Sequence, residues 1–316
     1  MGNRKYELSD ETKTLEDGTV LRRIRAAMNF VTVDGSTVSD GDLGGWIENE
    51  SNLSHDGKAW VFGDSRVYGN AEVYGNARVY GNAAVYGDSR ISGTAKVGGN
   101  ARICGGAEVC GNARVFGDSR VYGKAEVYCD SRVYGKAEVY CNARVCGNAA
   151  VYDIANVYGD AEVYGDANVH GSARVYGNAK VYGDANVHGS ARVFGTSGVF
   201  GCAEVHGTAW VFGEAHVYGN AKVCGHALVS GGADVCGDAI VSDRHGYATY
   251  KNTWSSGRWF TYTSSNGMWK VGCFHGTGDE LIAKAYKDSE LSGRCYEAIV
   301  RAQEAIDREI HKGCRK

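Results

Sequence analysis

The chain has 316 residues, a net charge of −3, 43% hydrophobic residues and no proline. No apolar run approaches the length of a membrane span, so we expect a soluble protein without a membrane partner. The near-neutral charge does not indicate nucleic-acid binding, and the eleven cysteines lack the spacing of metal sites. We therefore expect no disulfide framework, no metal and no cofactor.

Residues 1–60 have a mixed composition and precede a long repetitive segment. Strand-like stretches at 19–24 and 29–33 are followed by the Gly-rich segment 41–47. The open end of a repetitive β-structure exposes unpaired strand edges that favour end-to-end association. The sequence therefore predicts that 1–60 is a cap over the first repeat.

Residues 61–241 repeat with a period of six. Every sixth residue from Val61 to Val241 is Val or Ile, and Ala or Ser stands four residues after each of the first thirty. Alternation places these small and β-branched residues inside, whereas Gly with Asn or Asp forms the corners between strands. The absence of proline suits a continuous ladder. We predict an all-β, single-stranded parallel β-helix of ten turns, with 18 residues in each.

Residues 242–316 differ in composition and form a third, α+β module. Its first half is aromatic and strand-rich, and its tryptophans either form a small core or contact a partner. These are Trp254, Trp259 and Trp269. Two helices are expected to follow, the first from about Asp279 to before Gly293 and the second from about Arg294 to His311. We also expect Cys273 to pack in the core of this module, although Cys273 with His275 would suit a nucleophile and its base.

The Val/Ile-first, Ala/Ser-fifth hexad resembles the hexapeptide-repeat family, whose members form left-handed, triangular β-helices and include many trimeric acyltransferases. The beginning of the chain, including Tyr6 and Asp42–Ile47, is similar to bacterial putative transferases and bacteriophage proteins of unassigned function. The C-terminal part of the chain, which includes 268–274, is similar to a C-terminal sequence segment found in such phage proteins. This resemblance implies the cytoplasm of a bacterial host cell, or a virion, as the location.

Two outward faces interleave basic and aromatic side chains, which suits phosphates and stacked bases but is also typical of a solvated β-face. The residues of this candidate binding surface are Arg78, Tyr80, Arg114, Phe116, Arg132 and Tyr134 on one face, and Arg120, Tyr122, Arg174 and Tyr176 on the other. The third face is richer in glutamate. No residue is assigned a catalytic role.

His170, His188 and His206 lie one predicted turn apart. A metal or catalytic column is one interpretation, and duplication of a repeat unit is the other, because 167–175 recurs almost unchanged at 185–193. Stacked histidines on a flat face cannot easily surround a cation, which favours duplication.

We expect a non-catalytic phage-type solenoid that acts as a rigid spacer or binding scaffold. Its partner would be a protein or further copies of the chain, a trimer included. One alternative is an acyl-CoA-dependent acyltransferase of the hexapeptide class. However, the unbroken hexads leave no room for the protruding loop that such enzymes use. The other alternative is a phage counter-defence protein that captures a nucleotide signal or a host protein. A nucleotide or a nucleic acid is a further possible partner of the scaffold.

Overall fold

The computed structural model describes residues 4–313, with side chains described through Ile310. It consists of two compact units, one ending at Gly189 and the other beginning at Ser190. Among the residues described, no helix is both long and apolar enough to cross a membrane.

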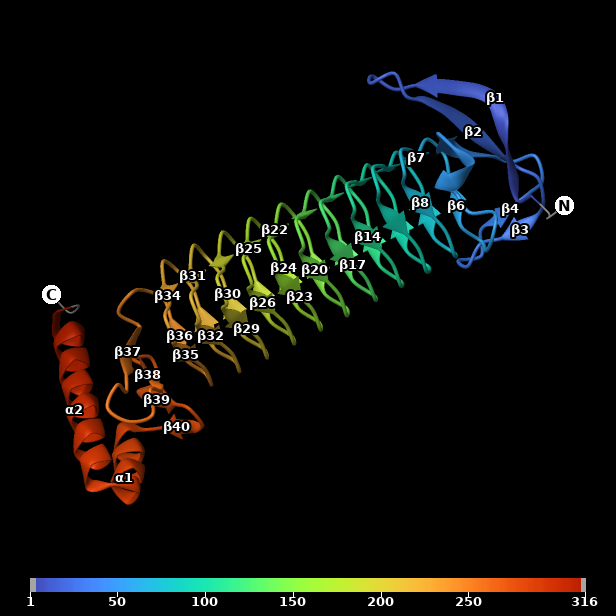
Figure 1. Ribbon diagram of the computed structural model, residues 1–316. Coiled ribbons are helices and arrows are strands. Elements are labelled where there is room, and N and C mark those ends of the chain that lie inside the picture. The colour runs from blue at the N-terminus through green and yellow to red at the C-terminus, as the bar shows by residue number, and fades with distance from the viewer. Residues whose placement is uncertain (1–3, 314–316) are drawn as a thin grey trace. The chain divides into compact units, whose positions relative to one another are not determined.

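The hexads of the first unit fold into stacked coils (Figure 1). Each hexad contributes one two-residue strand that ends at its Val or Ile, starting with β6 (Trp60–Val61) and β7 (Arg66–Val67) and continuing at every sixth residue to β27 (Asn186–Val187). Each strand pairs in parallel with the strand 18 residues later, as Val67 does with Val85. Three successive strands therefore make one coil and belong to three different sheets. The predicted parallel β-helix is confirmed.

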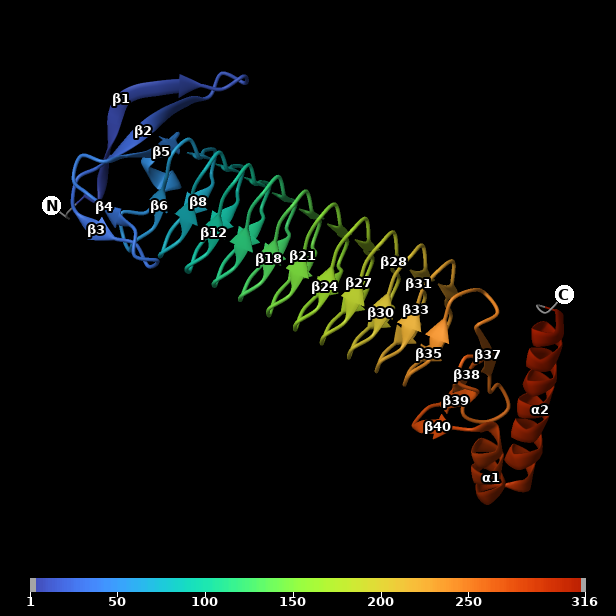
Figure 2. The same ribbon diagram turned by 180° about the vertical axis from the view of Figure 1, so that it is seen from behind.

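The coils of the first unit form three parallel sheets, which we call the β7, β8 and β9 sheets after one strand of each. The β7 sheet contains β5, β7, β10, β13, β16, β19, β22 and β25; the β8 sheet contains β8, β11, β14, β17, β20, β23 and β26; and the β9 sheet contains β6, β9, β12, β15, β18, β21, β24 and β27. Figure 2 shows the coils from behind.

The repeat residues occupy the positions that alternation predicts. Val157 and Ala161 are completely buried, as are the other valines and isoleucines at the first hexad position and the alanines at the fifth. Backbone amides donate along the stack to the next coil, as Arg66 N does to Ala83 O at 2.8 Å. The core is therefore a column of small and β-branched side chains enclosed by a continuous hydrogen-bond ladder.

The corners place one residue of each hexad in the left-handed region, which glycine adopts without strain. Cys129, Cys141 and Asp153 replace glycine there at φ of 60°, 61° and 60°. The following corner residues bond between coils, as the Asn142 side-chain amide does to the Asp160 carboxylate at 2.9 Å.

The N-terminal segment forms a hairpin and then joins the coils. The hairpin strands β1 (Tyr6–Thr14) and β2 (Val20–Ala26) are antiparallel, and β2 is also antiparallel to β5 (Leu43–Ile47). The short strands β3 and β4 and the 3-10 helix η1 complete the segment. Their bounds are Phe30–Val31, Thr37–Val38 and Glu50–Asn52.

The coils begin before Val61, because β5 pairs in parallel with β7 and Leu53 forms a parallel bridge to Val73. The solenoid consequently has about 11 turns rather than the predicted ten. Ile47 pairs with Val67, 20 positions later, instead of 18. Two extra residues thus break the six-residue period and hide the first turn in the sequence.

Carbonyl groups of the first coil, which have no preceding coil, bond to the N-terminal strand. The Tyr6 hydroxyl lies 3.0 Å from Glu50 O and 2.7 Å from Leu53 O. The buried Lys5 ammonium donates to Ala59 O at 2.9 Å. These bonds satisfy acceptors that would otherwise be buried without a partner.

The second unit contains coil strands from β28 (Arg192–Val193) to β36 (Ile240–Val241), followed by an antiparallel sheet and two helices. The sheet strands are β37 (Tyr247–Lys251), β38 (Trp259–Thr263), β39 (Met268–Val271) and β40 (Phe274–Gly276), and the helices are α1 (Gly278–Asp288) and α2 (Glu290–Gly313). Phe260, Trp269 and Val300 are among the buried residues of their common core.

Side chains of this module accept hydrogen bonds from amides of the last coil. Ser230 N donates to the Tyr247 hydroxyl at 3.1 Å, Asp234 N to Thr261 at 2.8 Å, and Ile240 N to Ser265 at 2.8 Å. Amides that would pair with a following coil are therefore already occupied.

The second helix begins at Glu290, so the predicted start at Arg294 was wrong. Ser289 ends α1 and also accepts a hydrogen bond from Ser292 N at 3.1 Å, which caps α2. Gly293 lies in the first turn of α2. Its lack of a side chain makes room for the Tyr286 ring, with which a Cβ would clash. Gly293 thus marks a close contact between the helices and not a boundary.

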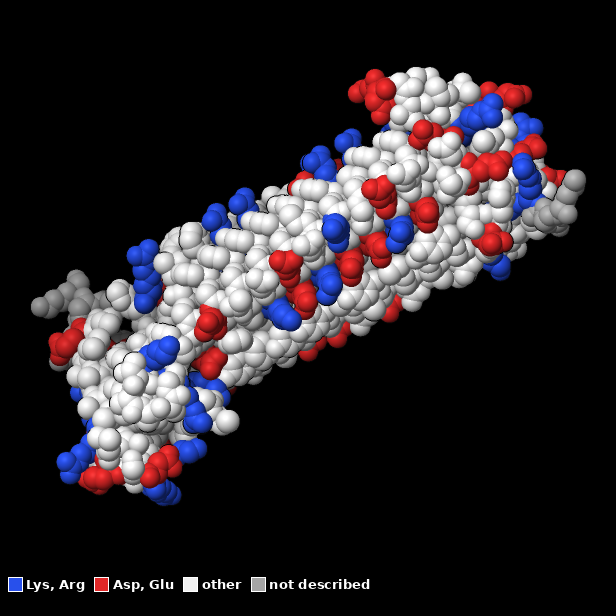
Figure 3. Space-filling model, in the orientation of Figure 1, with Lys and Arg blue, Asp and Glu red and all other residues white. Residues whose placement is uncertain are grey.

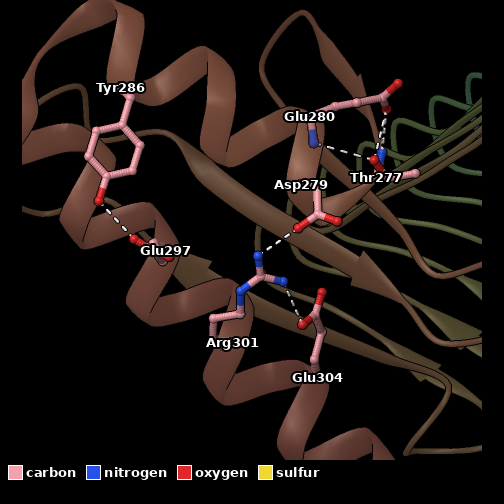
Figure 4. A network of polar contacts seen from close by, with 7 residues as sticks. All are labelled: Thr277, Asp279, Glu280, Tyr286, Glu297, Arg301 and Glu304. Atoms are coloured by element: carbon pink, nitrogen blue, oxygen red, sulfur yellow. Dashed lines mark hydrogen bonds and ion pairs between the residues drawn. The ribbon is translucent and has the colours of Figure 1, made fainter.

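Polar contacts also connect the two helices (Figure 4). The Arg301 guanidinium bonds Asp279 at 2.6 Å and Glu304 at 3.0 Å, and the Tyr286 hydroxyl donates to Glu297 at 2.7 Å. Thr277 and Glu280 form a capping box at the start of α1. Of these contacts, Arg301–Asp279 and Tyr286–Glu297 join α1 to α2.

Candidate binding surfaces

The β9 sheet carries four cations on consecutive strands. Arg78 pairs with Lys96, Lys96 with Arg114, and Arg114 with Arg132. Their backbones lie at intervals of about 4.8 Å, so like charges stand directly opposite one another. Such an arrangement is destabilising unless an anion neutralises it.

Asp34, in the β3–β4 turn, neutralises only the first part of this cation ladder. Its carboxylate forms ion pairs with Arg78 and with Lys96, the latter at 3.5 Å. Burial, together with the charges of Arg78 and Arg114, lowers the pKa of Lys96. Within residues 4–313, Arg114 and Arg132 are exposed and form no ion pair. These two side chains remain available to an anionic partner.

An aromatic column runs beside the cation ladder. Phe116 stacks on Tyr134 with ring centroids 5.1 Å apart, and Tyr134 stacks on Tyr152 at 4.8 Å. Tyr80 is separated from this column because its ring covers Gly98, where a Cβ would clash. The structure therefore places all six predicted residues of this face on one sheet.

The other predicted face lies on the β7 sheet. Tyr122, Tyr140, Tyr158 and Tyr176 stack in succession on this sheet, with each centroid distance 4.8 Å. Arg120 is less available than predicted, because it forms an ion pair with Glu138 at 3.1 Å. Arg174 is exposed.

The β8 sheet is a zipper of opposite charges and not simply an acidic face. Arg144 lies between Glu126 and Glu162 at 3.4 and 3.9 Å, and Lys180 approaches Glu162 at 3.1 Å. Figure 3 shows acidic and basic side chains interspersed along this face. Exposed pairs of this kind contribute little each, typically about 0–1 kcal/mol.

His170 and His188 stack in the first unit at 4.9 Å, and His206 belongs to the second unit. Burial and neighbouring His188 lower the pKa of His170, although Asp153 stands 3.7 Å away. Among the described residues, no group of three or more His, Cys, Asp or Glu side chains is arranged to hold a metal. His170 instead extends the aromatic column, 4.6 Å from Tyr152.

The three candidate tryptophans have different environments. Trp269 is completely buried in the core of the C-terminal module. Trp259 packs over Gly232 of the last coil, where a Cβ would clash with its ring. Trp254 is 38% exposed and lies edge-on to Tyr296. Core packing therefore accounts for Trp269 but not for Trp254.

Cys273 is exposed near the turn between β39 and β40, so the prediction that it packs in the core was wrong. The turn places it outside the alternation of the flanking strands. All ten cysteines in the described range are free thiols.

A cavity of about 350 Å³ adjoins η1, and His55 lines it. The His55 ring stacks on Tyr6 at 4.3 Å, and its Nδ1 accepts from Lys5 N at 3.3 Å. Burial lowers the pKa of His55. This cluster, which the sequence analysis missed, packs the N-terminal strand against the first coil.

Sequence analysis also missed the space between the β1–β2 hairpin and the β7 sheet. This cavity of about 500 Å³ is lined by the hairpin end and by three consecutive strands of the sheet. The only signal in the sequence was Arg66 and Arg102 with Tyr68 on one face, because nothing in the hairpin sequence indicates where its end lies.

Comparison with known protein families supports the repeat architecture. A family model described as the YdcK beta solenoid repeat matches residues 77–93, 107–123 and 173–189. Each matched segment contains one strand from each of the three sheets. The chain is a β-solenoid repeat protein. No curated protein matches it significantly.

Proposed function

We propose that this β-solenoid is a non-catalytic scaffold of phage type that holds its terminal segments, 1–60 and 242–316, at a fixed separation. The observation that carries the proposal is the uniformity of the coils. Within each unit, every strand from β6 to β36 has two residues and follows the preceding one by six, with no inserted loop. The resemblance of both chain ends to phage proteins supports the phage origin.

The spacer role can be tested by measuring the separation of the ends. Spin labels would be introduced with an unnatural amino acid at Asp40 and Lys287, two exposed positions. Pulsed electron paramagnetic resonance should give a narrow distance distribution. A broad distribution in the intact protein would contradict a rigid spacer.

Coil deletions provide a matched pair for the same measurement. Removing 169–186 deletes one coil and leaves each later strand in its own sheet, so the mean distance should shorten by at most about 4.8 Å without broadening. Removing only 169–174 moves each later strand to the next sheet and should change the distance differently. Identical distances for both deletions would sink the proposal.

The second candidate is capture of an anionic ligand or partner, as a counter-defence protein would require, and the exposed Arg114 and Arg132 favour it. The catalytic alternative is an acyl-CoA-dependent acyltransferase of the hexapeptide class. Thermal shift with nucleotides and with acetyl-CoA separates these candidates. Stabilisation by nucleotides that Arg114→Gln with Arg132→Gln abolishes supports capture. Acetyl-CoA turnover that is lost when His170, His188 and His206 are replaced by alanine would establish the enzyme instead.

A further inference from the structure

The β1–β2 hairpin extends beyond its pairing with β5 (Figure 1). Residues of the hairpin end and of the β7 sheet line a common cleft. The cleft has a volume of about 500 Å³. Its lining includes Lys13 and Asp17 from the hairpin and Arg66, Tyr68, Tyr86 and Arg102 from the coils. Cavities of roughly 300–1,000 Å³ are typical of small-molecule sites.

The floor of the cleft is a gap between two arginines. Ala84 pairs with Arg66 on one side and with Arg102 on the other. Ala84 places only a methyl group between their side chains and lines the cleft, and two strand intervals separate the backbones of the two arginines by about 10 Å. Both guanidinium groups can therefore approach one anion from opposite sides.

One of these arginines has an unsatisfied donor. Arg66 Nε is buried and has no hydrogen-bond partner among the residues described. A buried donor without a partner costs about 1–3 kcal/mol, so a shift of the Arg66 side chain that lets a bound oxyanion accept from Nε would be favourable.

Two tyrosines form the wall of the cleft. Tyr68 and Tyr86 stack with ring centroids 5.0 Å apart. Burial raises the pKa of Tyr68, and burial with a hydrogen bond to Cys104 raises the pKa of Tyr86 to about 12. Both hydroxyls therefore stay protonated at neutral pH. The Tyr86 hydroxyl already donates to Cys104, so Tyr68 is the one that can donate to a ligand.

The hairpin end supplies carboxylates opposite the arginines. Asp17 accepts a hydrogen bond from Thr19 N at 2.9 Å, and this bond lowers the pKa of Asp17. Glu16 also lines the cleft. Anionic carboxylates accept hydrogen bonds from hydroxyl groups but repel a second anion. The cleft thus has a cationic floor and a hydrogen-bond-accepting roof.

We propose that this cleft binds a sugar phosphate, with its phosphate between Arg66 and Arg102 and its sugar hydroxyls directed to Asp17. Arginine favours phosphate because its planar fork can donate two parallel hydrogen bonds. A free sugar phosphate and a nucleotide share this chemistry. The site is additional to the scaffold role, and its test does not depend on that role.

Calorimetric titration with ribose 5-phosphate, AMP and inorganic phosphate tests the proposal on the full chain. At least one of the two sugar phosphates should bind more than about tenfold tighter than inorganic phosphate. Tighter binding of AMP than of ribose 5-phosphate would identify a nucleotide site, and equal binding a sugar phosphate site. No saturable binding of either compound overturns the proposal.

Two pairs of variants place the binding in the cleft. Ala84→Leu should fill the floor and weaken binding at least about tenfold, whereas Ala150→Leu, at an equally buried outward alanine of another sheet, should not. Arg102→Gln should also weaken binding, whereas Arg120→Gln, further along the β7 sheet, should not. Because Arg102 is exposed, Arg102→Gln should fold normally, and it tests the cleft even if Ala84→Leu fails to fold. Equal affinities for the members of each pair would refute the assignment.

Discussion

Single residues in this solenoid are constrained by their place in the hexad more than by their chemistry. Cysteine illustrates this. Cys141 occupies a corner with φ of 61°, whereas Cys146 lies outward and half-buried immediately after a coil strand. A side chain in the left-handed region costs about 1–2 kcal/mol. The same residue type is therefore strained in one position and unstrained five residues later.

Cys141→Gly should stabilise the protein by about 1 kcal/mol, because glycine removes this strain. Cys146→Gly is the matched control and should destabilise by about 0.5–1 kcal/mol, since glycine weakens an extended segment. Chemical denaturation of both variants checks the prediction. A change of the same sign in both would show that φ is not the determining factor.

Val157→Asp should abolish cooperative folding, because Val157 has no exposed surface and a carboxylate there would have no partner. Tyr158→Ser should cost only about 1–2 kcal/mol, since Tyr158 is partly exposed and loses two stacking contacts. Circular dichroism and thermal melting distinguish them. Equal stabilities would reverse the assignment of inward and outward positions.

At the scale of elements, neighbouring strands and helices are joined by stacked or closely packed side chains that sequence patterns only partly reveal. The six-residue period correctly predicted which side chains share a sheet, such as Arg114 with Arg132. It did not reveal that Asp34 pairs with Arg78, because that contact depends on a turn outside the repeat. Helix propensity likewise placed a boundary at Gly293, where packing against Tyr286 decides instead.

Gly293→Ala tests the contact between Gly293 and Tyr286, because this contact should remove the stabilisation that alanine usually gives in a helix. Alanine normally stabilises a helix interior by about 1 kcal/mol relative to glycine. Beside Tyr286 the new Cβ would clash, so the variant should be no more stable than the parent protein. In a Tyr286→Ala background the same change should stabilise by about 1 kcal/mol. A double-mutant cycle with no coupling would contradict the contact.

The tyrosine stack should make the protein sensitive to alkali. Burial, and the charge of Glu138, raise the pKa of Tyr122 to about 12, above its usual value of 10.0. The folded state then binds more protons than the unfolded state, so stability should fall as the pH rises from about 10 to 12. Melting temperature and tyrosinate absorbance report this. Tyr122→Phe keeps the ring and should reduce the slope, and an unchanged slope would exclude Tyr122 as a source.

At the scale of the whole molecule, the sequence predicted the repeating part well and the junctions poorly. The parallel coils, their inward residues and the α+β character of the ending follow from local periodicity. The first turn was missed because two extra residues interrupt that periodicity before Val67. The hairpin cleft was missed because it depends on where Lys13 lies relative to Arg102, 89 positions later in the chain.

The occupied hydrogen-bonding groups at both ends have a consequence for how such a chain can evolve. Tyr6 and Lys5 satisfy carbonyls of the first coil, and Tyr247, Thr261 and Ser265 satisfy amides of the last. Neither set of contacts depends on how many coils stand between. Unequal recombination between near-identical gene segments, such as those encoding 167–175 and 185–193, can therefore add or remove whole coils in a single event. Chain length is then a heritable variable that selection can adjust without redesigning either terminus.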